Sequence, residues 1–136
     1  MKILFDTSVL VAALLDSHPK HAIAFQWLVK AKHKEIEGYI GIHTLVELYA
    51  ILTSLPVQRK VSSPDIWRLL QDSVFSNFEV IQLTKADYQD TLESLSQSDI
   101  RGGATYDALI ARAAFNAKVD KLFTFNIKHF MRVNCN

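Results

Sequence analysis

Four short apolar segments, separated by longer stretches of helical character, constrain the fold of this chain most strongly. They are residues 2–5, 38–42, 78–83 and 121–125. Segments this short without a polar face are typical of strands covered on both sides in a parallel sheet. Parallel strands need crossover connections, and the stretches between the segments carry apolar residues at helical spacing. The order of elements therefore predicts an α/β fold in which helices cover both faces of a parallel sheet.

Capping patterns predict where the helices begin. The expected first or capping residues are Thr7 or Ser8, Pro19, Thr44, Ser63, Thr84, and Thr105 or Tyr106. The pattern from Thr84 to Asp87 is typical of a capping box. Pro56 is expected to end the helix that carries Glu47, and residues 57–62 to form a connection. A last helical turn over 127–131 and a short edge strand over 132–135 are also expected.

One later helix is expected to bury a wide apolar stripe. Its predicted members are Ile66, Trp67, Leu69, Leu70, Val74 and Phe75. Residues at such spacing lie on one side of a helix, and that side usually faces the core.

Composition sets limits on the class of protein. The 136 residues, 49% of them hydrophobic, suit a single domain over 1–136. The only cysteine, Cys135, excludes an internal disulfide and cysteine-rich zinc sites. The longest apolar run, residues 9–15, is far shorter than the ~20 residues of a membrane span and lacks the flanks of a signal peptide. We therefore expect a soluble cytoplasmic protein with no membrane contact.

Charge gives no overall indication of nucleic-acid binding, because the formal net charge is only +1. Positive side chains concentrate in one segment of the sequence. We interpret them as the solvated face of a helix and the residues that directly follow it. They are Lys20, His21, Lys30, Lys32, His33 and Lys34.

Three carboxylates occupy positions where apolar residues would be expected. Asp6 follows the first apolar segment, while Glu47 and Asp107 each have apolar neighbours three and four positions further along a predicted helix. A buried, unpaired carboxylate is costly to ionise, so three of them in a small domain favour a shared hard cation with oxygen ligands. In an open α/β fold, ligands bind beyond the carboxyl ends of the strands, where Asp6 should lie.

Each of these residues also has a structural interpretation. Asp6 can be a helix cap, the head of Glu47 can reach water from the edge of its stripe, and Asp107 can be stabilised by a helix dipole. Asn126 follows the last apolar segment together with Thr124, where it can close a turn or complete a site.

Other acids and motifs carry less information. Asp87, Asp90, Glu93 and Asp99 lie in polar surroundings and are expected to be solvated. The five histidines lack a paired metal-ligand spacing. Phosphate-loop, dinucleotide-binding and nucleophile-elbow motifs do not occur.

The acids and their surroundings resemble those of the PIN-domain nucleases, especially the small ribonuclease toxins of VapBC toxin–antitoxin pairs. The resemblance covers nearly the whole chain through four segments in order: Ile3-Leu4-Phe5-Asp6-Thr7-Ser8-Val9-Leu10, Thr44-Leu45-Val46-Glu47-Leu48, Tyr106-Asp107-Ala108-Leu109-Ile110-Ala111 and Thr124-Phe125-Asn126-Ile127-Lys128-His129-Phe130. It implies a three-layer α/β/α sandwich, a Mg²⁺ or Mn²⁺ site, hydrolysis of RNA phosphodiesters, a homodimer and an antitoxin protein as partner.

The resemblance also assigns residues to the site. Asp6, Glu47 and Asp107 match the metal-binding acids of the family. Thr7 or Ser8 and Thr124 match hydroxyl positions that orient ligands or water. Asn126 stands where many relatives carry a fourth acid, so this site is less negative by one charge and could hold one metal ion or two.

Three other functions remain possible at the level of sequence. A haloacid-dehalogenase phosphatase also begins with a strand and an aspartate, but it requires a second aspartate where this chain has Ser8. A phosphate-accepting receiver domain is also α/β, although the sequence resembles it less. The more serious alternative is a PIN-like module of weak or no activity that binds RNA or a protein partner.

Overall fold

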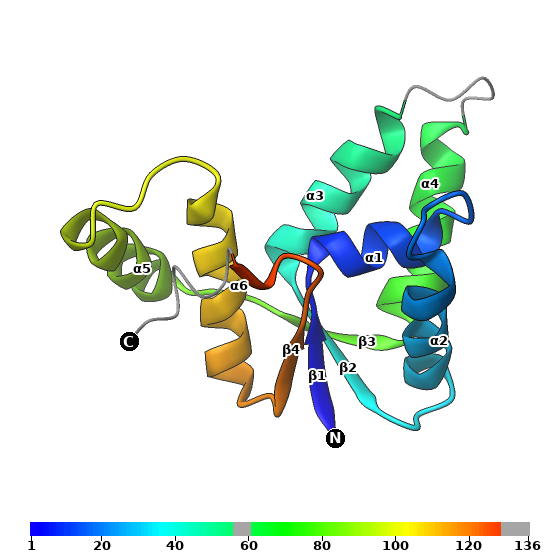
Figure 1. Ribbon diagram of the computed structural model, residues 1–136, viewed down its shortest axis with the longest axis horizontal. Coiled ribbons are helices and arrows are strands. Elements are labelled where there is room, and N and C mark those ends of the chain that lie inside the picture. The colour runs from blue at the N-terminus through cyan, green and yellow to red at the C-terminus, as the bar shows by residue number, and fades with distance from the viewer. Residues whose placement is uncertain (56–60, 129–136) are drawn as a thin grey trace.

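A four-stranded parallel sheet forms the centre of the molecule. The computed structural model describes residues 1–55 and 61–128. The strands are β1 (Lys2–Phe5), β2 (Glu37–Gly41), β3 (Phe78–Ile81) and β4 (Lys121–Phe123), and they lie in the order β3-β2-β1-β4 (Figure 1). Strands β2 and β3 thus lie on one side of β1, and β4 lies on its other side. Ligands bind at such a switch point in α/β folds.

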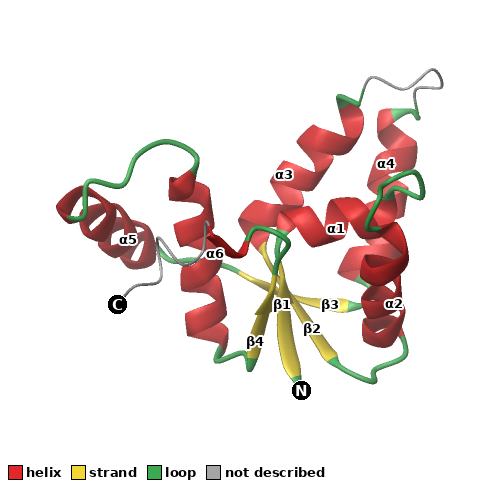
Figure 2. Ribbon diagram, viewed as in Figure 1, coloured by secondary structure: helices red, strands yellow, loops and turns green. Residues whose placement is uncertain are grey.

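Helices cover both faces of this sheet. They are α1 (Thr7–Leu14), α2 (His21–Lys32), α3 (Ile42–Thr53), α4 (Ser63–Leu70), α5 (Lys85–Gln97) and α6 (Ala104–Ala117), with the π-helical segment η1 (Gln71–Phe75) after α4. Helices α1 to α4 pack together on one side, whereas α6 covers the other side and α5 packs against α6 (Figure 2). The predicted α/β/α sandwich is confirmed.

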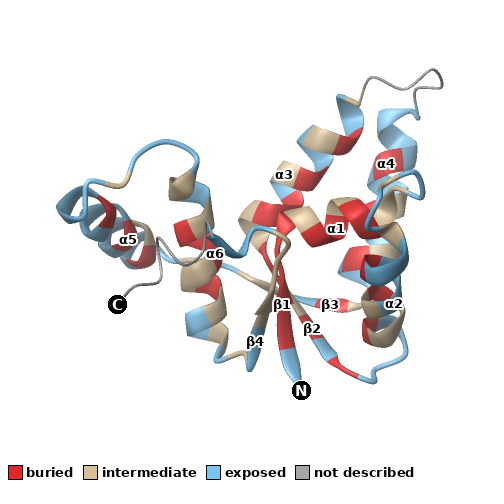
Figure 3. Cartoon of the chain, in the orientation of Figure 1, coloured by how far each residue is buried: buried red, intermediate tan, exposed pale blue. Residues whose placement is uncertain are grey.

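Alternation along β1 divides the core between the two faces. Phe5 is fully buried, and its ring meets Phe78 and Phe123 edge to face, with centroids 5.0 and 5.5 Å away. Leu4 points the other way and packs with Ile110 of α6. Both faces of the sheet are therefore apolar, which explains why the strand segments lack a polar alternation. Figure 3 shows most of β1 as buried.

Several predicted helix starts are wrong by a few residues. Asp6, rather than Thr7 or Ser8, caps α1 by accepting the backbone N–H of Val9. Helix α3 begins directly after Gly41, so Thr44 lies inside the helix, fully buried. The cause is local, because a serine or threonine one turn inside a helix has the same sequence signature as a cap.

The remaining starts also need adjustment. Ser62 caps α4 through the N–H of Asp65, one residue before the predicted Ser63. Helix α2 begins at His21 instead of Pro19, and α6 begins at Ala104. The predicted capping box of Thr84 and Asp87 is confirmed at the start of α5.

The wide apolar stripe predicted after Ser63 is wrong in part. Ile66, Leu70 and Val74 are buried at intervals of one turn, but Trp67 and Phe75 are 47% and 43% exposed. These two rings pack edge to face on the surface, 5.6 Å apart. The helix contacts the core along one narrow row, so residues beside that row remain in solvent.

Asp87 is the one acid whose expected solvation is wrong. It is 7% exposed, and its side chain accepts hydrogen bonds from the Thr84 backbone and from Arg112 of α6. Arg112 also lies 3.8 Å from Asp90. This contact joins α5 to α6, a tertiary relation that the local sequence does not encode.

The end of the chain departs from the predictions in one way that shapes the site. Strand β4 ends at Phe123, so Thr124 and Phe125 leave the sheet instead of extending it. Ile127 and Lys128 are helical. The predicted stop at Pro56, the connection over 57–60, the rest of the last turn and the edge strand over 132–135 lie outside the described residues. In the part that is described, no helix combines the length and apolar character needed to cross a membrane.

Candidate active site

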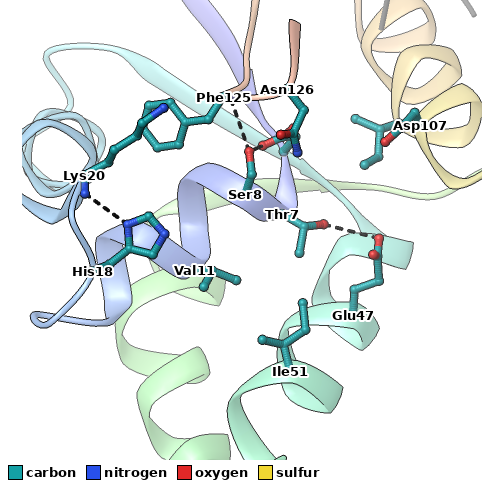
Figure 4. A pocket seen from close by; sticks show the side chains of 12 residues that line it. Thr7, Ser8, Val11, His18, Lys20, Glu47, Ile51, Asp107, Phe125 and Asn126 are labelled. Carbon is teal, nitrogen blue, oxygen red and sulfur yellow. Dashed lines mark hydrogen bonds between the residues drawn. The ribbon is translucent and has the colours of Figure 1, made fainter. Parts of the chain in front are cut away.

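A cleft of about 490 Å³ opens where β1 and β4 end (Figure 4). The residues that line it are Asp6, Thr7, Ser8, Val11, His18, Lys20, Glu47, Ile51, Asp107, Ile110, Phe125 and Asn126. The structure therefore brings the four residues predicted as catalytic, Asp6, Glu47, Asp107 and Asn126, to one cavity. The cavity lies at the switch point of the sheet, the position at which this fold class binds ligands.

Asp6 is the most buried of the acids, at 3% exposure. Its Oδ1 accepts hydrogen bonds from the Ser8 hydroxyl at 2.6 Å and the Val9 backbone at 3.1 Å. Its Oδ2 accepts one from the Thr124 hydroxyl. Donors on both oxygens offset the cost of burying the charge and fix the orientation of the carboxylate. Asp6 is thus a helix cap and also lines the cleft, so its two interpretations are compatible.

The same hydroxyls hold the segment after β4. Ser8 Oγ accepts the backbone N–H of Phe125 at 3.2 Å, and Thr124 Oγ1 accepts that of Asn126 at 2.8 Å. The Asp6 backbone N–H donates to the Phe123 carbonyl at 3.1 Å. The supporting hydroxyls therefore connect the carboxylate to the segment that places Asn126 at the cleft.

Glu47 reaches the cleft from the first half of α3. Its Oε1 accepts a hydrogen bond from the Thr7 hydroxyl at 3.2 Å. The same oxygen lies 3.1 Å from His43 Nδ1, an ion-pair distance without the geometry of a hydrogen bond. The His43 ring in turn stacks on Tyr106, with centroids 5.0 Å apart. Sequence reasoning missed His43, although its position one turn before Glu47 was a usable signal.

Asp107 approaches from the opposite wall. It lies in the first turn of α6 and is partly buried, with Tyr106 exposed beside it. In Figure 4 it faces the cleft across from Thr7 and Glu47. Asp107 is therefore one of the residues that line the cleft.

The donors at the cleft are chemically suited to a hard divalent cation. Three carboxylates and the side-chain amide of Asn126 offer oxygen ligands, as Mg²⁺ and Mn²⁺ prefer. Within residues 1–55 and 61–128, no three His, Cys, Asp or Glu side chains already form a closed metal-binding group. The carboxylates share the cleft without being drawn together around one point.

Lys20 and His18 were not recognised as cleft residues from the sequence. The sequence predicts a solvated position for Lys20, and the residue is exposed; it also lines the cavity, with its ammonium 4.6 Å from the centre of the Phe125 ring. Lys30, from the same positive group, lies over Trp27 instead, at 4.3 Å. A cluster of positive residues in sequence is thus split in space between the cleft and a helix side.

Comparison with known proteins places this fold and cleft in a class. The family model of the PIN domain matches residues 3–134, and the chain belongs to that family. Among its relatives is the ribonuclease VapC40 of Mycobacterium tuberculosis, 33% identical over 123 residues that cover 90% of this chain and 85% of the relative. The ribonuclease VapC27 of the same organism is 34% identical over 109 residues, which cover 80% and 74%.

Solved structures show the same fold. VapBC2 from Rickettsia felis, crystallised with a DNA fragment from its promoter, is 22% identical with a TM-score of 0.65, covering 97% of this chain and 92% of that one. FitAcB from Neisseria gonorrhoeae is 18% identical with a TM-score of 0.69, covering 97% and 93%. The resemblance to the PIN-domain nucleases inferred from the four sequence segments is confirmed.

Proposed function

We propose that this PIN-domain protein is a metal-dependent endoribonuclease and the toxin of a toxin–antitoxin pair. The observation that carries the proposal is the convergence of Asp6, Glu47 and Asp107, from three different helices or their caps, on one cleft. Two ribonuclease relatives that align with most of the chain support the same reaction. RNA is therefore the proposed substrate, and hydrolysis of its phosphodiester bonds the proposed reaction.

Asp6, Glu47 and Asp107 would hold Mg²⁺ or Mn²⁺, and the amide oxygen of Asn126 would add a neutral ligand or position water. When bound, such a cation would lower the pKa of a water molecule and offset negative charge on the phosphate. Without a cation, three carboxylates would repel the substrate. Because Asn126 contributes no charge, we expect one cation to bind more strongly than any second one.

The neighbouring hydroxyls keep the acids in place. Ser8 and Thr124 donate to Asp6, and Thr7 donates to Glu47. These bonds occupy part of the acceptor capacity of each carboxylate and leave further lone pairs free for a ligand. We assign Thr7, Ser8 and Thr124 to the positioning of the metal ligands.

We also propose two protein partners, an antitoxin and a second copy of this chain. The solved structure of VapBC2 from Rickettsia felis, which shares this fold, supports the first. The homodimer rests on the family resemblance. Light scattering of the purified protein would test the dimer. Co-expression with a small DNA-binding protein encoded beside it, followed by copurification, would test the antitoxin.

Cleavage of a mixed RNA pool tests the proposed reaction. Purified protein is incubated with Mg²⁺, Mn²⁺ or EDTA, next to Asp6→Asn and Asp107→Asn, which keep the shape of the carboxylates. We expect the wild type to cut RNA with either metal and not with EDTA. In each variant, the rate of cleavage should fall by at least about 100-fold. Folded wild-type protein that binds RNA but never cuts it would instead indicate a binding module, and undiminished cutting by both variants would refute this active site.

A further inference from the structure

The cleft has two chemically different ends. Glu47 and Asp107 lie at one end, while Lys20 and His18 lie at the other, on the loop between α1 and α2 (Figure 4). Asp6, the N-cap of α1, also lines this cleft. A single ligand that fills the cleft must therefore contact hydrogen-bond donors, one of them the positively charged Lys20, at one end. At the other end it must contact the acids or a metal ion bound to them.

The Lys20 ammonium is held at its end by contacts that lead back to the acids. Lys20 is exposed, and its charge lies over the face of Phe125, 4.6 Å from the ring centre. The backbone N–H of Phe125 donates to Ser8 Oγ, which donates to Asp6. This chain of contacts fixes the position of the Lys20 ammonium relative to the Asp6 carboxylate.

His18 adds a second donor beside it. The backbone N–H of Lys20 donates to His18 Nδ1 at 3.0 Å, so that nitrogen carries a lone pair and the proton of the neutral ring lies on Nε2. In Figure 4 this second nitrogen faces the cleft. The ring therefore presents an N–H donor to whatever occupies the cavity.

The loop that carries both residues is held by its own hydrogen bonds. The N–H of His18 donates to the Leu15 carbonyl, and the N–H of His21 donates to the His18 carbonyl, both at 3.0 Å. His21 Nδ1 lies 2.9 Å from the Ala12 carbonyl of α1. These bonds fix the two donors relative to α1, whose cap is Asp6, so little ordering is required when a ligand binds.

We propose that Lys20 and His18 bind the phosphodiester next to the one that is cut, and so set the direction in which the RNA strand crosses the cleft. This inference rests on the proposed ribonuclease function. The Lys20 ammonium carries a positive charge and His18 Nε2–H is a further donor beside it, which together favour an anionic phosphate. Stacking of a base on Phe125 is disfavoured, because Lys20 covers one face of its ring and Phe123 contacts it edge to face at 5.6 Å.

The salt dependence of RNA binding tests the proposal apart from catalysis. A fluorescent single-stranded RNA of about 12 nucleotides is titrated with Asp107→Asn protein, with and without Lys20→Gln, between about 50 and 300 mM salt. We expect Lys20→Gln to weaken binding about 10-fold near 100 mM salt and to make the log–log slope shallower by about 0.7, the loss of one phosphate contact on a single strand.

Lys30→Gln is the matched control. It removes the same charge from a lysine that also packs on an aromatic ring, but Lys30 is not among the residues that line the cleft. The RNA affinity and the slope of its salt dependence should equal those of the Asp107→Asn protein within error. In the cleavage-competent protein, Lys20→Gln should raise KM about 10-fold and lower kcat much less, because the contact is made equally in the ground and transition states.

His18 is tested by a rescue pair. His18→Ala should weaken RNA binding severalfold, and His18→Gln, which keeps an N–H donor, should restore part of the loss.

If Lys20→Gln matches Lys30→Gln in slope and KM while the wild type cuts RNA, the phosphate subsite is refuted and the ribonuclease function stands. If Lys20→Gln abolishes binding of a poly-glutamate peptide but leaves RNA binding intact, the subsite serves an acidic protein segment and the proposal fails. Absence of any RNA binding or cutting by the wild type would refute the function itself.

Discussion

Asp6 illustrates how one residue can serve both the fold and the site. It begins α1 as a cap, yet it is also one of the acids that line the cleft, because the helix starts directly at the end of β1. Its three hydrogen-bond donors, from Ser8, Val9 and Thr124, make a buried charge tolerable. Sequence reasoning could propose the acid and the cap separately, but the donor from Thr124 depends on the tertiary pairing of β1 with β4.

Thr124→Val tests this support. The substitution keeps the shape of the side chain, removes one donor from the buried carboxylate and leaves the Asn126 N–H without its acceptor. We expect the free energy of unfolding to fall by about 2 kcal/mol, the usual cost of losing a hydrogen bond to a charged group. Urea denaturation measures this change in the free energy of unfolding. Thr53→Val, an exposed site at the end of α3, should change stability by less than about 0.5 kcal/mol; equal effects of the two substitutions would contradict the account.

Asp87 provides a pH-dependent prediction. Its pKa is lowered from 3.8 to about 2, chiefly by the hydrogen bond from the Thr84 backbone and then by the Asn116 side chain, while burial acts in the opposite direction. The folded pKa is below the unfolded value, so the unfolded chain takes up the proton first. The stabilisation is therefore fully present above pH about 4 and is lost as the pH falls towards about 2.

Asp87→Asn should remove this dependence. Urea denaturation at pH 6, 4 and 3 should show that the wild type is more stable than the variant at pH 6 and that the difference shrinks at pH 3. Asp99→Asn is a suitable control, because Asp99 is exposed and pairs only with the exposed Arg101 among the described residues. A difference for Asp87→Asn that stays constant over this pH range would show that the carboxylate does not titrate as described.

At the level of elements, β2 packs closely against its neighbours at Gly38. A Cβ at this position would lie 2.7 Å from two ring carbons of Phe78 and 3.2 Å from the Ala31 Cβ of α2. Phe78 is itself packed against Phe5, so its ring has little room to move. The close approach of β2, β3 and α2 therefore depends on glycine.

Gly38→Ala should reduce the free energy of unfolding by about 1–3 kcal/mol, the typical cost of overpacking a core. Gly103→Ala is the matched control, because a Cβ there meets nothing within 4 Å and the backbone is already helical. Thermal or urea denaturation compares the two variants with the wild type. A stability loss at Gly38 no larger than at Gly103 would contradict the close packing.

Elements were predicted well where their signals are local. The strands beginning at Lys2, Phe78 and Lys121 and the capping box at Thr84 follow from apolar runs and turn chemistry. Exposure of Trp67 could not be predicted, because it depends on how narrowly α4 contacts the core. The same holds for Asp87, whose partner Arg112 is distant in sequence.

At the level of the whole molecule, parallel topology assembles the site. The reversal of strand order between β1 and β4 brings the ends of both strands together, and α3 and α6 supply acids from opposite walls. Sequence alone proposed the four acidic and amide residues through their apolar surroundings and the family resemblance. It gave no indication that Lys20 and His18 share the same cavity, since a lysine-rich helix start resembles an ordinary solvated surface.

Calorimetric titration with Mn²⁺ tests the central claim, that Asp6, Glu47 and Asp107 form one cation site, most directly. The wild type is compared with Asp6→Asn, Glu47→Gln and Asp107→Asn, and with Lys30→Gln as a folded control, each verified by circular dichroism. We predict one dominant binding event in the wild type and in Lys30→Gln, weakened at least about 10-fold by each carboxylate substitution. Unchanged Mn²⁺ affinity in all three carboxylate variants would contradict the account, because the cation would then bind elsewhere.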